Sequence, residues 1–90
     1  MRVAVLLALF GWGILPCNAW SLDAEQWFVE GNRFSSAGKF EEAVRAYQKS
    51  IDQNAMAPVA HYNLGIAYKN LRQLDKAAVV LEKAVGLAPS

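Results

Sequence analysis

A spacing of 34 residues relates the two halves of this chain, and it constrains the fold more than any other sequence feature. Gly31 and Gly65 are separated by this distance, and other landmark pairs share it: Phe34 and Tyr68, Phe40 and Leu74, Ala43 and Ala77, Tyr47 and Leu81, Ile51 and Val85. At positions 34 residues apart, the two copies share side-chain size and polarity more often than identical residues. Such a period is typical of a repeat architecture, in which one supersecondary unit stacks on the next.

Within each copy, apolar residues recur at the period of a helix. In the second copy one run contains Leu64, Tyr68 and Leu71, and the other extends over residues 74–85. Leu71-Arg72-Gln73 lies between the runs and predicts a short turn. Each copy therefore predicts two antiparallel helices, so the fold class is all-α, with two tandem helical hairpins.

Small residues on these stripes indicate close helix packing. Antiparallel helices approach to roughly 8–10 Å only where the side chains between them are small. We therefore expect Gly31 to face Ala43 and Gly65 to face Ala77 inside each hairpin. Glycine in a helix interior costs about 1 kcal/mol relative to alanine, so its return after one period suggests that packing offsets this cost.

The predicted helix ends carry residues suited to those places. Ser21 or Asp23 can cap the first helix, whose inward stripe we expect to include Ala37. Gly38 suits a helix end, where the backbone requires a positive φ. Pro58 suits the first turn of the third helix, because its missing N–H has no helical partner there.

The two copies resemble tetratricopeptide repeats, and we place them at residues 24–57 and 58–90 within a domain of residues 20–90. In the first copy, residues of the family pattern stand at Trp27, Gly31, Phe34, Ala43, Tyr47 and Ala55. In the second they stand at Leu64, Gly65, Tyr68, Ala77, Leu81, Ala84 and Pro89. The departures are Glu30 for Leu, Ser50 for Ala, His61 for Trp and Ala55 for Pro.

Residues 1–19 have the plan of a secretory signal peptide. Met1-Arg2 precedes an apolar run over residues 3–15, and a small residue, Ala19, ends the segment. We predict cleavage near Ala19 and an exported protein, periplasmic or secreted. The alternative is a buried or amphipathic helix at an ordinary N-terminus. The run is shorter than the roughly 20 residues that span a bilayer.

Cys17 allows a second interpretation of residues 1–19, as the signal peptide of a lipoprotein. A cysteine just after an apolar run could be the lipid-modified first residue of a bacterial lipoprotein, and the protein would then be tethered to a membrane. Pro16 stands where such a site usually has a small residue. Cleavage after Ala19 would instead leave a chain without cysteine, so neither a disulfide nor a thiolate metal site could form.

Composition excludes several classes of function. Without residues 1–19 the chain loses only Arg2 among its charges, which leaves eight basic and eight acidic residues. A neutral chain lacks the basic surface that nucleic-acid binding requires. His61 is the only histidine, and we find no nucleophile, acid–base pair or phosphate loop, so we expect no enzyme activity and no cofactor.

The resemblance implies a binding site for a protein or peptide partner. In this family the first helix of each hairpin lines a concave face that holds an extended segment. At these register positions the groove residues are Phe28, Val29, Asn32, Ser35, Tyr62, Asn63, Ile66 and Lys69. Asn32 and Asn63 match asparagines with which some members grip a C-terminal carboxylate, whereas Phe28 replaces their lysine. An apolar or aromatic segment is therefore the expected ligand, unless Phe28 and Tyr62 only pack between the hairpins.

The last predicted helix is apolar over a wider arc than its counterpart. Val79 and Val80 replace Arg45 and Ala46 of the first copy, whereas terminal repeats normally present a polar outer side. The sequence therefore predicts self-association through this helix, a docked partner, or a longer repeat protein of which this chain is a fragment. Our prediction is an exported adaptor or scaffold without catalysis, and the alternative is a lipid-anchored component of an envelope complex.

Overall fold

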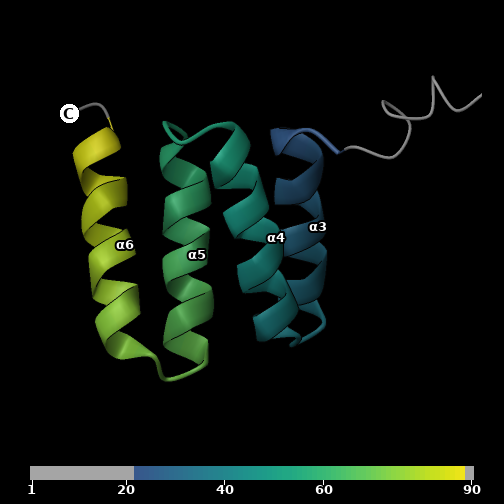
Figure 1. Cartoon of the computed structure of the whole chain (residues 1–90). Coiled ribbons are helices and arrows are strands. Elements are labelled where there is room, and N and C mark those ends of the chain that lie inside the picture. The colour runs from purple at the N-terminus through teal and green to yellow at the C-terminus, as the bar shows by residue number, and fades with distance from the viewer. Residues whose placement is uncertain (1–21, 89–90) are drawn as a thin grey trace, which may run out of the picture.

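Four α-helices form the part of the chain that the computed structural model describes, residues 22–88. They are α3 (Ala24–Ser36), α4 (Phe40–Gln53), α5 (Pro58–Asn70) and α6 (Leu74–Leu87). The helices stand in a row in chain order, and each packs against the next, while α5 also contacts α3 (Figure 1). The described residues contain no strand, so the prediction of an all-α fold with two tandem hairpins is confirmed.

The predicted leader, with Cys17 and Ala19, lies outside the described residues. Between residues 22 and 88, no helix combines the length and the apolar character that crossing a membrane would require.

The helix ends follow the predicted local chemistry. Asp23 caps α3 through its carboxylate, which accepts from the backbone N–H of Gln26, and the Gln26 side chain accepts in return from the Asp23 N–H. Pro58 occupies the first turn of α5. Gly38 has a φ of 76° between α3 and α4, and Arg72 has a φ of 66° between α5 and α6. The two turns thus use the same left-handed backbone at positions one repeat apart.

One hydrophobic core runs through both hairpins. Its buried members are Ala43, Tyr47, Leu64, Ala67, Tyr68 and Ala77, and half-buried apolar side chains from α3, α4 and α6 surround them. Each large apolar side chain removed from water contributes roughly 1.5–3 kcal/mol. Ala37 is exposed at the end of α3 instead of extending the inward stripe, because the helix stops at Ser36.

The helical glycines contact larger neighbours than we predicted. A Cβ atom added to Gly31 would lie 2.5 Å from the Tyr47 ring, and one added to Gly65 would lie 2.6 Å from the side chain of Leu81. The nearest side chains are thus one turn further along the opposing helix than Ala43 and Ala77. Each glycine thus makes room for a bulky residue of the opposing helix, which the prediction did not include.

Two side chains near the end of α4 fasten the start of α3. The Ser50 hydroxyl donates to the carbonyl of Ala24 over 2.7 Å, and the Gln53 Nε2 donates to the carbonyl of Leu22 over 2.6 Å. Ser50 is buried, so its hydroxyl satisfies a backbone carbonyl at the edge of the core. This bond accounts for a serine where the family pattern has alanine.

Candidate functional site

Asn32 and Asn63 join the first helices of the two hairpins. Asn63 lies on α5, and its Nδ2 donates to Oδ1 of Asn32 on α3 over 3.0 Å. The same oxygen accepts from the Tyr47 hydroxyl of α4 over 2.6 Å. These bonds bring together two of the predicted groove residues and fix them to a third helix.

The unused polar atoms of this asparagine pair are accessible to solvent. Among the described residues no partner hydrogen-bonds Nδ2 of Asn32 or Oδ1 of Asn63. Within the same residues, His61 Nδ1 is the buried side-chain nitrogen or oxygen that lacks a partner. The two asparagine atoms are therefore not buried, and they remain available to a ligand.

Apolar side chains flank the asparagine pair on both helices. Val29 on α3 is 48% exposed, and Val59 and Tyr62 on α5 are 57% and 53% exposed. Phe28 is half-buried, with its ring 5.9 Å from that of Tyr47, so it is partly used in packing. We use the name α3–α5 face for the surface formed by the following residues: Phe28, Val29, Asn32, Ser35, Val59, Tyr62, Asn63, Ile66 and Lys69.

The other predicted groove residues lie along the same two helices. Ser35 on α3 is half-buried, and its Oγ is 3.5 Å from the Tyr47 hydroxyl. Ile66 on α5 is half-buried, and Lys69 near the end of that helix is exposed. The face thus carries apolar side chains, neutral amides and one cation.

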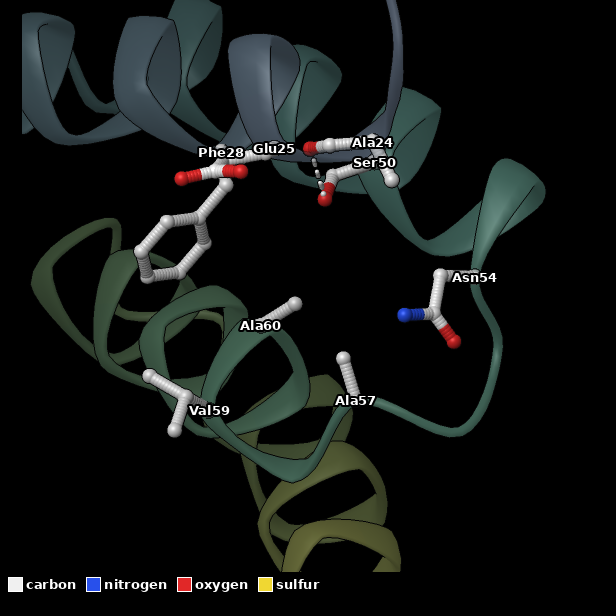
Figure 2. A pocket seen from close by; sticks show the side chains of 8 residues that line it. All are labelled: Ala24, Glu25, Phe28, Ser50, Asn54, Ala57, Val59 and Ala60. Atoms are coloured by element: carbon white, nitrogen blue, oxygen red, sulfur yellow. Dashed lines mark hydrogen bonds between the residues drawn. The ribbon is translucent and has the colours of Figure 1, made fainter.

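A hollow of about 180 Å³ lies where α3, α4 and α5 meet. Figure 2 shows the Phe28 ring and Val59 on one side of this hollow and Asn54 on the other, with the hydrogen bond from Ser50 to Ala24 beside it. Its lining residues are Ala24, Glu25, Phe28, Ser50, Asn54, Ala57, Val59 and Ala60. Drug-sized ligands occupy roughly 300–1,000 Å³, so this hollow suits a single side chain.

Of the predicted groove residues, Phe28 alone lines this hollow. The other lining residues were not predicted, and among them Val59 is the exposed apolar side chain. A signal existed: Val59, Tyr62 and Ile66 are spaced three and four residues apart and form a second apolar stripe on α5. That stripe is separate from the buried one containing Leu64.

His61 has a structural environment. It is 5% exposed, and its Nε2 lies 2.9 Å from the carbonyl oxygen of Ala55, to which it donates in the corresponding tautomer. Residues 22–88 hold no cluster of histidine, cysteine, aspartate and glutamate able to bind a metal ion.

Comparison with known proteins identifies the repeats. A family model described as TPR repeat matches residues 31–71, and one described as tetratricopeptide repeat matches residues 58–90. The chain belongs to the tetratricopeptide repeat family. Tetratricopeptide repeats indicate a protein–protein interaction module, and domains built from them are generally non-catalytic.

Relatives share these tetratricopeptide repeats over part of their length. The TPR repeat-containing protein MJ1428 of Methanocaldococcus jannaschii is 29% identical over 66 residues, which are 73% of this chain and 12% of that protein. A probable UDP-N-acetylglucosamine–peptide N-acetylglucosaminyltransferase, SPINDLY of Oryza sativa, is 33% identical over 54 residues, which are 60% of this chain and 6% of that protein. The chain thus spans a small fraction of these curated relatives.

Proposed function

We propose that this protein is a non-catalytic adaptor or scaffold that binds an extended apolar segment of a partner protein across the α3–α5 face. The observation that carries this proposal is the exposure of Val29, Val59 and Tyr62 beside the free amide atoms of Asn32 and Asn63. Apolar contacts would supply affinity, and the amides would align the backbone of the segment.

The hollow supports a ligand with at least one apolar side chain. Its walls are mainly methyl groups and the Phe28 ring, and its size suits one aliphatic or aromatic residue. A partner side chain seated there would bury Val59 and a further part of Phe28. Glu25 and Asn54 at the rim stay close to water.

A C-terminal carboxylate is a poorer ligand for this face. Phe28 occupies the place of the lysine that carboxylate-gripping relatives use, and the amides of Asn32 and Asn63 are neutral. An anion that leaves water for the asparagine pair loses solvation without gaining a paired charge there, since the one cation of the face, Lys69, is six residues further along α5 than Asn63. We therefore expect recognition of an internal segment rather than of a chain end.

Selection from a phage library of random linear peptides, followed by titration of the selected peptide, tests this proposal. The informative variants are a matched pair of exposed valines, Val59→Ser on the α3–α5 face and Val79→Ser on α6, which are 57% and 65% exposed. We expect Val59→Ser to weaken binding about tenfold, the equivalent of about 1.4 kcal/mol. Val79→Ser is expected to change the affinity less than twofold.

The opposite pattern, with binding lost in Val79→Ser and kept in Val59→Ser, would place the site on α6 and refute the proposal. Selection of peptides only by their free C-terminal carboxylates would refute the preference for an internal segment.

We further propose that residues 1–19 direct export and are removed, which would place the interaction module in the periplasm or outside the cell. The apolar run behind Arg2 and the small residue Ala19 support this proposal. Mass spectrometry of the protein recovered from its native host decides it: a chain beginning at Trp20 is expected. An acylated Cys17 would instead support the membrane-tethered component of an envelope complex.

Self-association through α6 is a second candidate, favoured by its exposed apolar residues. Leu74, Val79 and Val85 are 59%, 65% and 76% exposed. Sedimentation over a range of concentrations tests whether another copy covers them, and Val85→Glu is expected to return any dimer to monomer. A monomer at every concentration would exclude self-association and leave a docked partner or further repeats as the cover for α6.

A further inference from the structure

We propose that Tyr47 is a positioning residue for the α3–α5 face and sets what that face recognises. Its hydroxyl holds the Asn32 carboxamide with Oδ1 turned inward, so that Nδ2 is presented to the ligand. With Oδ1 of Asn63 beside it, the pair matches a neutral peptide amide. This inference rests on the proposed function of the α3–α5 face and names the chemical group that the face reads.

The distances determine which way the Asn32 carboxamide points. The Tyr47 hydroxyl is 2.6 Å from its partner atom on Asn32. This separation suits an O–H···O bond, whose usual length is about 2.7–2.8 Å, better than an N–H···O bond of about 2.9–3.0 Å. The atom that faces Tyr47 is therefore Oδ1. The 3.0 Å bond from Asn63 Nδ2 to the same atom is consistent with this assignment.

Tyr47 itself is held in place. It is 2% exposed, and its ring packs against Phe28 at a centroid distance of 5.9 Å. The other flank of the ring lies over the backbone of Gly31, where even a Cβ atom would approach to 2.5 Å. The ring cannot shift without disturbing the core, so its hydroxyl is a fixed donor, and Gly31 is the residue that makes room for it.

Two accepted hydrogen bonds occupy both lone pairs of Asn32 Oδ1. The groups left for a ligand are the two N–H donors of Asn32 Nδ2, the second N–H of Asn63 Nδ2 and the acceptor Oδ1 of Asn63. A backbone amide can accept from one of these donors through its carbonyl oxygen and donate its own N–H to Oδ1 of Asn63. A carboxylate has only acceptors, so it would leave Oδ1 of Asn63 without a donor. The pair is therefore better matched by a backbone amide.

An acetylated Gly-Leu-Val-Leu-Gly peptide, prepared with an amidated or a free C-terminus, provides the probe. Titrations are followed through the side-chain amide signals of Asn32 and Asn63 in ¹H–¹⁵N NMR spectra of the full chain. We expect the amidated peptide to bind more tightly than the free acid and to shift both signals. Tyr47→Phe keeps the packed ring and is expected to weaken binding of the amidated peptide about tenfold, the equivalent of one hydrogen bond.

Tyr68→Phe is the matched control, because it also removes one tyrosine hydroxyl from the core. That hydroxyl accepts from Gln48 Nε2 over 2.9 Å and has no bond to the asparagine pair. Its loss is expected to change the affinity less than twofold. Asn32→Asp tests the free donors directly: it keeps an acceptor for Tyr47 and Asn63 but replaces Nδ2 by oxygen. We expect this variant to bind the amidated peptide more weakly, because the Nδ2 donors are gone, and its negative charge to disfavour the free acid as well.

Binding by Tyr47→Phe at the wild-type affinity, or an equal loss in Tyr68→Phe, would overturn the role of Tyr47. A wild-type protein that binds neither peptide would count against the proposed function of the face. In that case the NMR spectrum of the free protein still tests the orientation of the Asn32 carboxamide. If our assignment is right, Asn63 has one side-chain amide proton protected from exchange with water. If Asn32 has the protected protons, the assignment is wrong.

Discussion

The two hairpins have the same arrangement of helices and turns, but they differ in the capping of their first helices and in the exposure of apolar residues on their second helices. The first begins with a capped helix at Asp23, whereas the second begins at Ala57, which makes no side-chain cap. Ile51 near the end of α4 packs against the core, whereas its counterpart Val85 in α6 is 76% exposed. Residues that face inward thus maintain the repeat geometry, while the other positions are free to diverge.

The two hairpins also differ in the side chain that packs against the glycine of their first helix. Gly31 accommodates a tyrosine ring that is buried and hydrogen-bonded, whereas Gly65 accommodates a half-buried leucine. The first contact is rigid and also serves the α3–α5 face. The second has only to fill space. Matched substitutions at equivalent positions of the two hairpins test these differences.

Substituting each packed glycine by alanine should separate the rigid contact from the adaptable one. Gly31→Ala pushes a Cβ into the fixed Tyr47 ring, and we expect a net destabilisation of about 2 kcal/mol after the gain in helix propensity. Gly65→Ala meets Leu81, which can change rotamer, so its net effect should stay within about 1 kcal/mol. Urea unfolding followed by circular dichroism measures both. Equal losses would show that the two contacts are equally rigid.

Shortening the paired residues Ile51 and Val85 compares a covered position with an uncovered one. Ile51→Ala removes half-buried methyl groups and should cost about 1.5 kcal/mol. Val85→Ala should change stability by less than about 0.5 kcal/mol, as an exposed substitution does. Thermal unfolding at low and high protein concentration gives the comparison. A larger loss for Val85→Ala that grows with concentration would show that another copy covers α6.

The two left-handed turn residues should respond in opposite directions. Gly38→Ala places a side chain at a φ of 76° and should destabilise the protein by about 1 kcal/mol, although nothing lies within 4 Å of the new Cβ. Arg72→Gly relieves the same strain at a φ of 66° and should stabilise it by up to about 1 kcal/mol. Urea midpoints measure both shifts. A loss of stability in Arg72→Gly would mean that the arginine side chain contributes more than its backbone strain costs.

Changing the N-cap residues of α3 and α5 should have the smallest effect on stability. Asp23→Ala removes the capping box of α3 and should cost about 0.5–1 kcal/mol. Ala57→Ser offers α5 a cap from an extended backbone and should gain about half of that amount. The shift of the thermal midpoint relative to the wild-type protein is the measurement. If Ala57→Ser has no effect, water already satisfies the first N–H groups of α5.

Periodicity predicted the helices and turns because they depend on local chemistry that residue types encode directly. The positive φ at Gly38 followed from glycine, but the same conformation at Arg72 did not, since arginine has no such preference. The repeat register alone could have indicated it. The contact of Gly31 with Tyr47 was missed because it depends on the offset between two helices, which spacing along the chain does not determine.

The helix positions of Asn32 and Asn63 were predictable from the sequence, but their hydrogen bonds were not. The register placed Asn32 and Asn63 on the first helices of successive hairpins, and the structure joins them. Their orientation depends on the Tyr47 hydroxyl, which comes from the second helix of the first hairpin. No pattern along the chain distinguishes a tyrosine that only packs from one that also orients an amide.

The bonds from Ser50 and Gln53 to the start of α3 also imply an order in which the structure opens. The equivalent residues at the end of α6 are Ala84 and Leu87, whose side chains have no polar group to hold the start of α5. Side-chain hydrogen bonds from α4 therefore hold the start of α3 in the first hairpin, whereas these two positions of α6 offer no such bond to the start of α5. Local opening should begin at α6, whose amide protons should exchange with deuterium fastest among the four helices. Since α3, α4 and α5 together hold the asparagine pair, the α3–α5 face should survive these openings.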